Sequence, residues 1–253
     1  MKNQTWDEIP ESYNEDSSTT ALGTAEEDHA PTKEQHPRLF SGISSDEYER
    51  IRRAGHVKQF ARGEILFIEG DVVERVLLLT SGAVKITKLG PGGEQVILRL
   101  SVPGDVLGAT NLFSSSRRCA TAEVFRPCRA LVWDAQVFEN LMKSFSILHQ
   151  NMVVILNEHL RELEARFYEV ATERVGPRVA LQLLRLLKSI GRPVNGEVEI
   201  GLSREELAQM TGTTLFTVSR LLSAWEARGA VRPCREAVAI RDVPSLRAIS
   251  AEE

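Results

Sequence analysis

Four side chains near residue 215 have the chemistry that reads DNA bases. The segment 211–226, TGTTLFTVSRLLSAWE, has the composition of a helix, and Leu215, Phe216, Ser219 and Arg220 lie on the outer face of its first turns. An arginine can donate two hydrogen bonds to O6 and N7 of guanine, and apolar side chains contact the methyl group of thymine. The segment therefore predicts a helix whose N-terminal end meets base edges in DNA.

The residues before this helix predict how it is positioned. Ser203 and Glu206 have the spacing of a capping box, which begins a preceding helix. Gly212 ends that helix, since glycine accepts the backbone conformation of a tight turn. Thr214 can cap the second helix, and both Thr214 and Thr217 suit phosphate oxygens at a helix start. The candidate DNA contacts are Ser203, Thr214, Leu215, Phe216, Thr217, Ser219 and Arg220.

Two short helices joined by a glycine-containing turn make a helix-turn-helix, whose second helix lies in the major groove of DNA. Val218, Leu221, Leu222 and Trp225 form the apolar stripe that faces inward. Downstream, AVRPCREAVAIRDVPSL (230–246) predicts two short strands around a turn, which would form a wing. A plain helical hairpin is the alternative, but it would leave two bulky apolar side chains exposed beside an arginine.

A heptad seam in the helical region from Phe138 to Thr172 predicts that two copies of the chain pair. Its apolar residues recur at steps of three and four, which is the spacing that joins two helices in a coiled coil. The candidate dimer contacts are Val153, Leu156, Leu160, Leu163 and Phe167. A second stripe, Leu148, Met152 and Ile155, can face the chain's own domain. The alternative is a long helix buried within one chain.

Net charge neither supports nor excludes DNA binding, whereas the cysteines suit a reducing cytoplasm. The 253 residues carry a net charge of −4, but nine acidic residues and two lysines lie in residues 1–36, which leaves the remaining chain slightly positive. Three scattered cysteines do not suit a disulfide framework. The sequence has no run of about 18 apolar residues, so a membrane span is not expected. The N-terminus does not have the pattern of a secretory signal.

The region from about 38 to 135 alternates short apolar strands with turns. RVLLLTSGAVKITKL (75–89) and EQVILRLSV (94–102) read as strands, and GPGG (90–93) and PGD (103–105) read as turns. This spacing favours a β-barrel or jelly roll. We therefore predict an α+β chain with an N-terminal β-roll, a long dimerisation helix and a C-terminal winged helix-turn-helix.

Several of these segments together resemble the Crp/Fnr family of bacterial transcription regulators. They are GEILFIEGD (63–71), SGAVKI (81–86), PGDVLG (103–108), the central helix and LSREELAQMTGTTLFTVSRLL (202–222). The resemblance implies a homodimer that binds an inverted-repeat operator in double-stranded DNA and contacts RNA polymerase. The expected divisions are an acidic disordered arm (1–37), a cyclic-nucleotide-binding-like β-roll (38–137), a dimerisation region (138–172) and a winged helix-turn-helix domain (173–253).

The same resemblance implies a degenerate effector pocket. Relatives that bind cyclic AMP hold the ribose with a glutamate and the phosphate with an arginine, and the matching positions in GDVLGATNLFSSSRRCATA (104–122) are Ala109 and Ala120. A buried phosphate without a paired cation is costly, so cyclic-AMP dependence is not expected. Arg118 could still aim inward and hold a nucleotide. The pocket candidates are Gly108, Ala109, Thr110, Arg117, Arg118, Cys119, Ala120 and Thr121.

No cofactor and no metal site are predicted. Haem is an alternative, with His149 or His159 of the central helix as an axial ligand, and Cys119 or Cys128 could be redox-active. An iron–sulfur cluster lacks its four thiolates in one subunit. No P-loop, G-x-S-x-G or H-E-x-x-H motif is present, so an enzyme is not expected. A different alternative is an effector-sensing regulatory protein whose C-terminal domain acts mainly through protein contacts.

Overall fold

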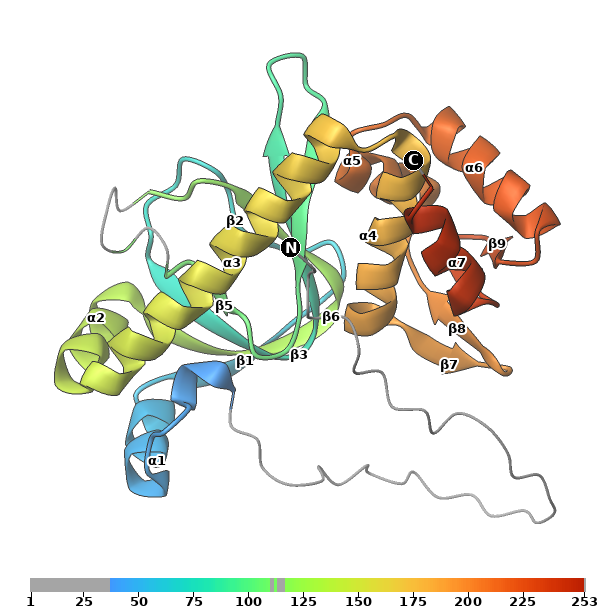
Figure 1. Cartoon of the computed structure of the whole chain (residues 1–253). Helices are drawn as coiled ribbons and strands as arrows, with labels where there is room; N and C mark the ends of the chain where they lie inside the picture. Colours follow the sequence, from blue (N-terminus) through green and yellow to red (C-terminus); the bar gives the residue numbers. More distant parts are fainter. Residues whose placement is uncertain (1–36, 110–111, 113–116, 253) are drawn as a thin grey trace, which may run out of the picture. The chain divides into compact units, whose positions relative to one another are not determined.

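The computed structural model describes residues 37–109, 112 and 117–252. Residues 1–36 of the predicted acidic arm and the pocket candidate Thr110 lie outside the described residues. An antiparallel β-roll is followed by a long helix and then by a helical domain with a small sheet (Figure 1). The predicted mixture of a roll, a central helix and a winged helix-turn-helix is confirmed.

The β-roll is one antiparallel sheet in the order β1-β6-β3-β4, with β2 paired to β6 and β5 paired to β3. Two long strands, β3 (Arg75–Leu89) and β6 (Thr121–Asp134), pair along most of their length. The shorter elements are η1 (Arg38–Phe40), α1 (Ser45–Arg53), β1 (His56–Phe60), β2 (Ile65–Phe67), β4 (Gln95–Ser101) and β5 (Val106–Leu107).

Gly82 permits the close approach of β3 to β6. Its φ is +81°, and a Cβ at this position would lie 2.2 Å from the carbonyl oxygen of Pro127. The register between the two strands shifts on either side of Gly82, at Ser81 and Ala83. Such irregularities bend strands, so this glycine helps the long β3–β6 strand pair to curl into a roll.

The predicted helical region from Phe138 to Thr172 contains a break. Helix α2 (Ala135–Ser144) ends before Phe145, whose backbone is extended, and α3 (Ser146–Thr172) follows it. The predicted helical region thus consists of two helices, and the predicted dimer contacts all lie in α3. The guanidinium of Arg50 in α1 lies over the Phe145 ring at 5.4 Å. This contact joins residues far apart in sequence, so local apolar periodicity does not reveal it.

One face of α3 packs against the roll. Leu148, Met152 and Ile155 are buried in the same apolar cluster as Trp133 and Phe138, as their spacing predicted. Asn151 on the same helix donates from Nδ2 to the carbonyl oxygens of Leu39 and Ser41, at 2.9 and 2.8 Å. The start of α3 is therefore held to its own roll by both apolar and polar contacts.

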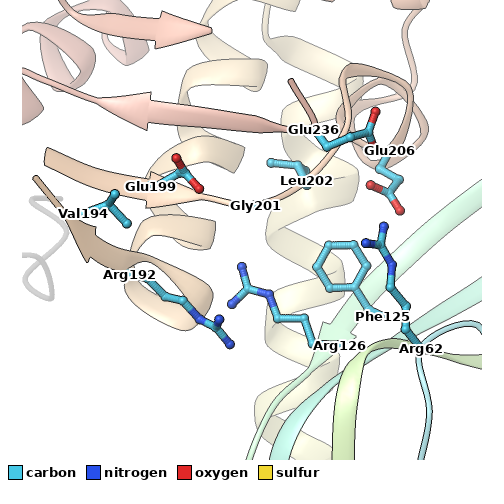
Figure 2. Close-up of a pocket in the computed structure, with 10 residues that line it drawn as sticks. All are labelled: Arg62, Phe125, Arg126, Arg192, Val194, Glu199, Gly201, Leu202, Glu206 and Glu236. Carbon is cyan, nitrogen blue, oxygen red and sulfur yellow. The ribbon is translucent and has the colours of Figure 1, made fainter. Parts of the chain in front are cut away.

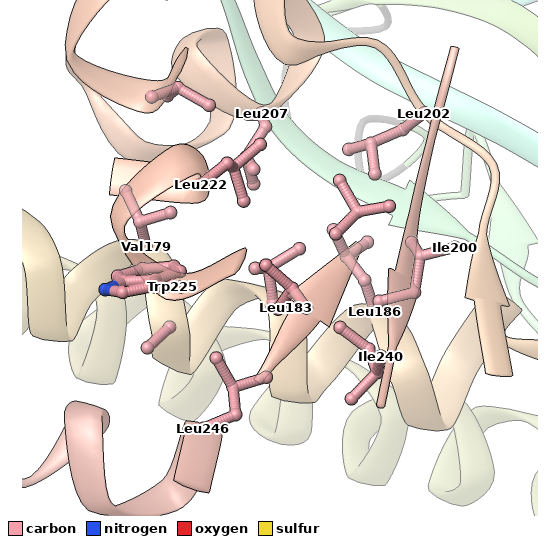
Figure 3. Close-up of a cluster of buried hydrophobic side chains, with 14 of the residues drawn as sticks. Val179, Leu183, Leu186, Ile200, Leu202, Leu207, Leu222, Trp225, Ile240 and Leu246 are labelled. Carbon is pink, nitrogen blue, oxygen red and sulfur yellow. The ribbon is translucent and has the colours of Figure 1, made fainter. Parts of the chain in front are cut away.

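As far as the structure describes it, the C-terminal domain consists of four helices and a four-stranded sheet of order β7-β8-β10-β9. Its elements are α4 (Val175–Ile190), β7 (Arg192–Val194), β8 (Glu197–Ile200), α5 (Arg204–Thr211), α6 (Leu215–Ala227), β9 (Val231–Cys234), β10 (Ala237–Ile240) and α7 (Val243–Ser250). Side chains from α4, α5, α6 and the sheet meet in one buried cluster, which includes Leu183, Leu207, Leu222, Trp225 and Ile240 (Figure 3).

The roll contacts the C-terminal domain through both apolar and polar side chains. Ala83 of β3 and Phe125 of β6 belong to the buried cluster of the C-terminal domain. Arg126 donates from Nη1 to the carbonyl oxygen of Ile190 at 2.9 Å, which ties the roll to the end of α4. No helix within the described residues is long and apolar enough to cross a membrane.

Candidate nucleic-acid interface

The turn between α5 and α6 is defined by the backbone of Gly212 and by the cap at Thr214. Gly212 has the left-handed backbone, with φ +59° and ψ 44°, that the sequence predicts for it. Thr214 caps α6 by accepting a hydrogen bond from the backbone N–H of Thr217 at 3.2 Å. The two threonine hydroxyls also lie 3.0 Å apart, within hydrogen-bonding distance. The start of α6 therefore has one defined direction relative to α5.

Helix α6 has one buried face and one exposed apolar end. Val218, Leu222 and Trp225 are buried in the domain core. Phe216 is 83 % exposed and the neighbouring Leu215 is also exposed. Isolated exposed apolar residues are ordinary, but two adjacent ones at a helix N-terminus form a surface that suits a partner. The structure thus places both residues where the sequence predicted a base-reading surface.

The polar members of the predicted site divide between the surface and the helix caps. Arg220 is exposed and forms no salt bridge with any other described residue, while Ser219 is half-buried. Ser203 is engaged in a complete capping box, because its hydroxyl bonds the Glu206 carboxylate at 3.0 Å and accepts from the Glu206 N–H at 3.1 Å. Arg220 is therefore available to a partner, whereas the Ser203 hydroxyl already has two contacts.

The wing is held to the sheet by a shared carboxylate. Glu197 of β8 accepts hydrogen bonds from Nε of Arg232 at 3.0 Å and from Nε of Arg241 at 2.7 Å. These bonds, Arg232 first, hold the pKa of Glu197 below its usual range. The thiol of Cys234 lies 3.0 Å from Nη1 of Arg232. The turn between β9 and β10 contains Glu236 with a φ of +56°, so the predicted wing is present and anchored at its base.

The heptad residues of α3 are mostly exposed in a single chain. Phe167 is 77 % exposed, and Val153, Leu160 and Leu163 are about half or more exposed. Leu156 differs, because it packs against the cluster between α3 and the roll. Four of the five predicted dimer contacts therefore form an apolar face without a partner among the described residues, which is the arrangement expected of a helix that pairs with a second copy.

Residues 104–122 of the roll, called the cassette here, contain a buried cation, Arg118. It lies two residues before Ala120, the position that the family resemblance assigns to a phosphate-binding arginine. Ala109 and Ala120 are both packed into apolar clusters. Arg118, by contrast, is only 5 % exposed, and its guanidinium approaches Gly108 so closely that a Cβ there would lie 1.9 Å from Nη1. Burial, before any other cause, lowers the pKa of Arg118 below its usual value.

Part of the Arg118 guanidinium has no acceptor among the described residues. Its Nη2 donates to the carbonyl oxygen of Arg75 at 2.7 Å, and its charge lies over the Phe67 ring at 4.0 Å. Nε and Nη1 are buried and have no hydrogen-bond partner in the part of the chain that the structure describes. Buried polar groups normally find partners, so this guanidinium has the properties of a site for an anionic group.

The other pocket candidates have structural contacts. Arg117 donates from Nη1 to the carbonyl oxygen of Gly70 at 2.8 Å, and Thr121 accepts from the N–H of Glu69 at 3.1 Å. Cys119 is exposed, and burial raises the pKa of the Cys128 thiol. No group of three or more potential metal ligands occurs within the described residues.

Sequence reasoning missed the residues that support the turn from behind. Arg178 of α4 donates from Nε to the carbonyl oxygen of Thr211 at 2.8 Å, and Gln182, one turn later, contacts the sulfur of Met210 at 3.6 Å. Both side chains are buried. A signal was present in the sequence, because Arg178 and Gln182 are four residues apart and interrupt the apolar face of α4.

Two family models match the chain. A cyclic nucleotide-binding domain model matches residues 57–145, and a Crp-like helix-turn-helix domain model matches residues 177–249. A CRP-like cAMP-activated global transcriptional regulator of Mycobacterium tuberculosis is 26 % identical over 210 residues, which span 82 % of this chain and 94 % of that protein. The cyclic AMP receptor protein of Thermus thermophilus is 27 % identical over 212 residues, with 84 % and 96 % covered.

Solved structures show the same fold. The c-di-GMP responsive global regulator CLP of Xanthomonas campestris superposes with a TM-score of 0.70 at 20 % identity, covering 79 % of this chain and 100 % of that one. FixK2 from Bradyrhizobium japonicum superposes with a TM-score of 0.69 at 23 % identity, covering 79 % and 98 %. The roll and the helix-turn-helix domain thus occur together in these proteins as they do here.

Proposed function

The chain belongs to the Crp/Fnr family of DNA-binding transcription regulators, and from this premise we propose that it acts as a homodimer on an inverted-repeat operator. The observation that carries the proposal is the exposed N-terminal end of α6, where Leu215, Phe216 and Arg220 are exposed while Val218, Leu222 and Trp225 are buried. Two copies paired along α3 would present two such ends to successive turns of the major groove, as paired recognition helices do.

The half-site follows from the side chains on that surface. Arg220 is a bidentate donor for guanine, and Leu215 and Phe216 suit thymine methyl groups. Thr214, Thr217 and the first backbone amides of α6 suit phosphate oxygens. We therefore expect a half-site with one guanine and an adjacent thymine. Family membership is the support for proposing RNA polymerase as a further partner.

The test uses a duplex selected by the full-length protein from a random library. Fluorescence anisotropy then measures the affinity of the native protein for this duplex and for a scrambled one. The same titration compares the affinities of Phe216→Ala and Val57→Ala for the selected duplex. Both side chains are strongly exposed, at 83 % and 60 %, so neither substitution threatens the fold. We expect the selected duplex to be palindromic, and Phe216→Ala alone to weaken its binding. Equal affinity of the native protein for selected and scrambled duplexes would contradict the proposal.

A second proposal concerns the roll, where the buried guanidinium of Arg118 favours an anionic effector. An anion seated there would supply acceptors for Nε and Nη1, which have none among the described residues. Ala109 offers no carboxylate to ribose hydroxyls, so we expect cyclic AMP itself to bind weakly. Mass spectrometry of freshly purified native and Arg118→Gln proteins under native conditions tests this. We expect a bound anion on the native protein only, and no bound anion on either protein, or the same anion retained equally by both, would refute the proposal.

A further inference from the structure

A second pocket, separate from the Arg118 site, lies where the roll meets the winged domain (Figure 2). Its volume is about 310 Å³, which is at the lower end of the range for small-molecule sites. Arg62, Phe125 and Arg126 line it from the roll, and residues of β7, β8, α5 and the wing turn line it from the other side. An occupant would therefore touch both parts of the molecule at once.

One side of this pocket is basic. The guanidinium groups of Arg126 and Arg192 approach the same space from β6 and β7 (Figure 2). Neither forms a salt bridge with a carboxylate of the described residues. Burial first, and then the like charge of Arg192, lower the pKa of Arg126, while the carboxylate of Glu199 opposes the shift. The two cations thus repel each other in a partly desolvated site, and an anion between them would relieve that repulsion.

The guanidinium of Arg126 is already oriented. Its Nη1 donates to the carbonyl oxygen of Ile190 at 2.9 Å. Its Nη2 lies beside Gly201, where an added Cβ would approach within 3.2 Å. Arginine binds phosphate through two parallel N–H donors, and a guanidinium fixed at one nitrogen loses little freedom when it binds a ligand. Arg126 is therefore prepared for an anion by the backbone around it.

The opposite side of the pocket is acidic. The carboxylates of Glu206 and Glu236 lie across from the two arginines, and Arg62 reaches toward Glu206 (Figure 2). Glu206 also bonds the Ser203 cap and lies 3.9 Å from Nζ of Lys85, so its position is fixed. Glu199 is on the basic side instead, because it lies opposite Arg192 in the backbone register of β7 and β8. Carboxylates accept hydrogen bonds only, so the acidic side suits a ligand with hydroxyl donors.

We propose that this pocket binds a sugar phosphate, with the phosphate between Arg126 and Arg192 and the sugar hydroxyls toward Glu206 and Glu236. Each end of such a ligand finds the chemistry that it needs: paired cations for the phosphate and acceptors for the hydroxyls. A purely anionic ligand would meet repulsion from the carboxylates, and a neutral sugar would leave the arginines uncompensated. The bound ligand would contact β6 of the roll and β7 and α5 of the winged domain.

Calorimetry on the full-length protein tests the site with three probes, which are ribose 5-phosphate, ribose and inorganic phosphate. We expect ribose 5-phosphate to bind at one site per chain, more tightly than inorganic phosphate, and ribose to give no heat. Arg192→Gln should weaken binding about 10- to 100-fold, as loss of a charge-assisted hydrogen bond predicts. Arg126→Gln should have a similar effect, but it also removes the bond to Ile190, so Arg192→Gln is the cleaner variant.

Two matched variants make the result specific. Arg247→Gln removes the same charge from an exposed position in α7 of the same domain, and Arg118→Gln alters the pocket of the roll. Both should bind ribose 5-phosphate as the native protein does. The proposal is overturned if no phosphorylated probe binds, if inorganic phosphate binds as tightly as ribose 5-phosphate, or if only Arg118→Gln loses binding. Operator affinity of each variant without ligand is measured separately, so that a failure of DNA binding is distinguished from a failure of this site.

Discussion

Nε of Arg178 donates to the carbonyl oxygen of Thr211 at 2.8 Å, which joins the first turn of α4 to the last residue of α5. Nη1 of the same guanidinium lies 3.3 Å from the carbonyl oxygen of Glu173, just before α4 begins. The last carbonyls of a helix lack intrahelical partners, and Arg178 satisfies one of them directly beside the turn. One buried side chain thus sets the position of α5, and through it that of α6.

Replacing Arg178 with methionine should destabilise the winged domain. The substitution keeps part of the apolar stem but leaves the carbonyl of Thr211 without its buried donor, which costs about 1–3 kcal/mol. Urea unfolding of the full-length chain measures the loss. Arg247→Met, at an exposed position in α7, should change the free energy of unfolding by less than about 0.5 kcal/mol. A native-like midpoint for Arg178→Met would show that the turn is held by other contacts.

Gly212 provides a test of the turn itself. Its φ of +59° is unfavourable for residues with a side chain, yet no atom lies within 4 Å of an added Cβ. Gly212→Ala should therefore cost about 1–2 kcal/mol through the backbone alone. Asparagine tolerates this conformation better than alanine, so Gly212→Asn should be the more stable of the two variants. Thermal unfolding measures both, and a reversed order would contradict the backbone explanation.

The helix-turn-helix was predictable because its signals are local. The capping box of Ser203 and Glu206, the glycine at 212 and the cap at Thr214 act within a few residues of one another. Each reflects a backbone preference that the sequence states directly. The start of both helices and the end of α5 therefore agree with the sequence prediction.

Other features depend on partners far away in sequence. Arg50 of α1 contacts Phe145 between α2 and α3, and Arg178 joins α4 to α5. The orientation of Arg118 in the cassette depends on Arg75 and Phe67, which lie about 40 or more residues earlier. The family resemblance assigned the phosphate-binding position to Ala120, whereas in the folded chain the guanidinium of Arg118 lies beside Gly108. Contacts of this kind are set by the folded chain and have no local periodicity.

Arg220→Ala should lose discrimination at a single base pair of the operator. If Arg220 forms the bidentate contact with guanine, its removal costs about 1–3 kcal/mol for the selected duplex and little for a duplex altered at that base pair. Anisotropy titrations of native and variant proteins with both duplexes give the coupling free energy between Arg220 and that base pair. A uniform loss on all duplexes, together with a shallower dependence on salt, would instead identify Arg220 as a phosphate contact.

His159 should make the stability of the chain depend on pH. Burial first, and then the nearby Arg99, lower the pKa of His159, while Asp105, Glu162 and Glu158 oppose the shift. Because the unfolded chain binds this proton more readily, stability is complete above the unfolded pKa of about 6.5 and falls as the pH drops toward the lower folded value. The slope from one group is at most about 1.4 kcal/mol per pH unit.

Urea unfolding of native and His159→Gln proteins between about pH 7.5 and 5 measures this effect, in the range where histidine titrates. The variant should lose less stability over the same interval, because glutamine does not titrate. His56→Gln serves as a matched histidine on strand β1 of the roll. Parallel pH profiles for the native protein and His159→Gln would rule out this residue as the source.

Phe167 gives the sharpest test of the paired helices. Its ring is 77 % exposed in one chain, so a charge at this position should leave the monomer folded. In the proposed dimer two such rings are buried, and Phe167→Lys should raise the dissociation constant of the dimer about 100-fold or more. Tyr168→Lys alters an adjacent side chain that is 65 % exposed but lies off the heptad seam, and it should leave the dimer intact. Sedimentation equilibrium measures both constants, and unchanged association of Phe167→Lys would show that α3 does not form the interface.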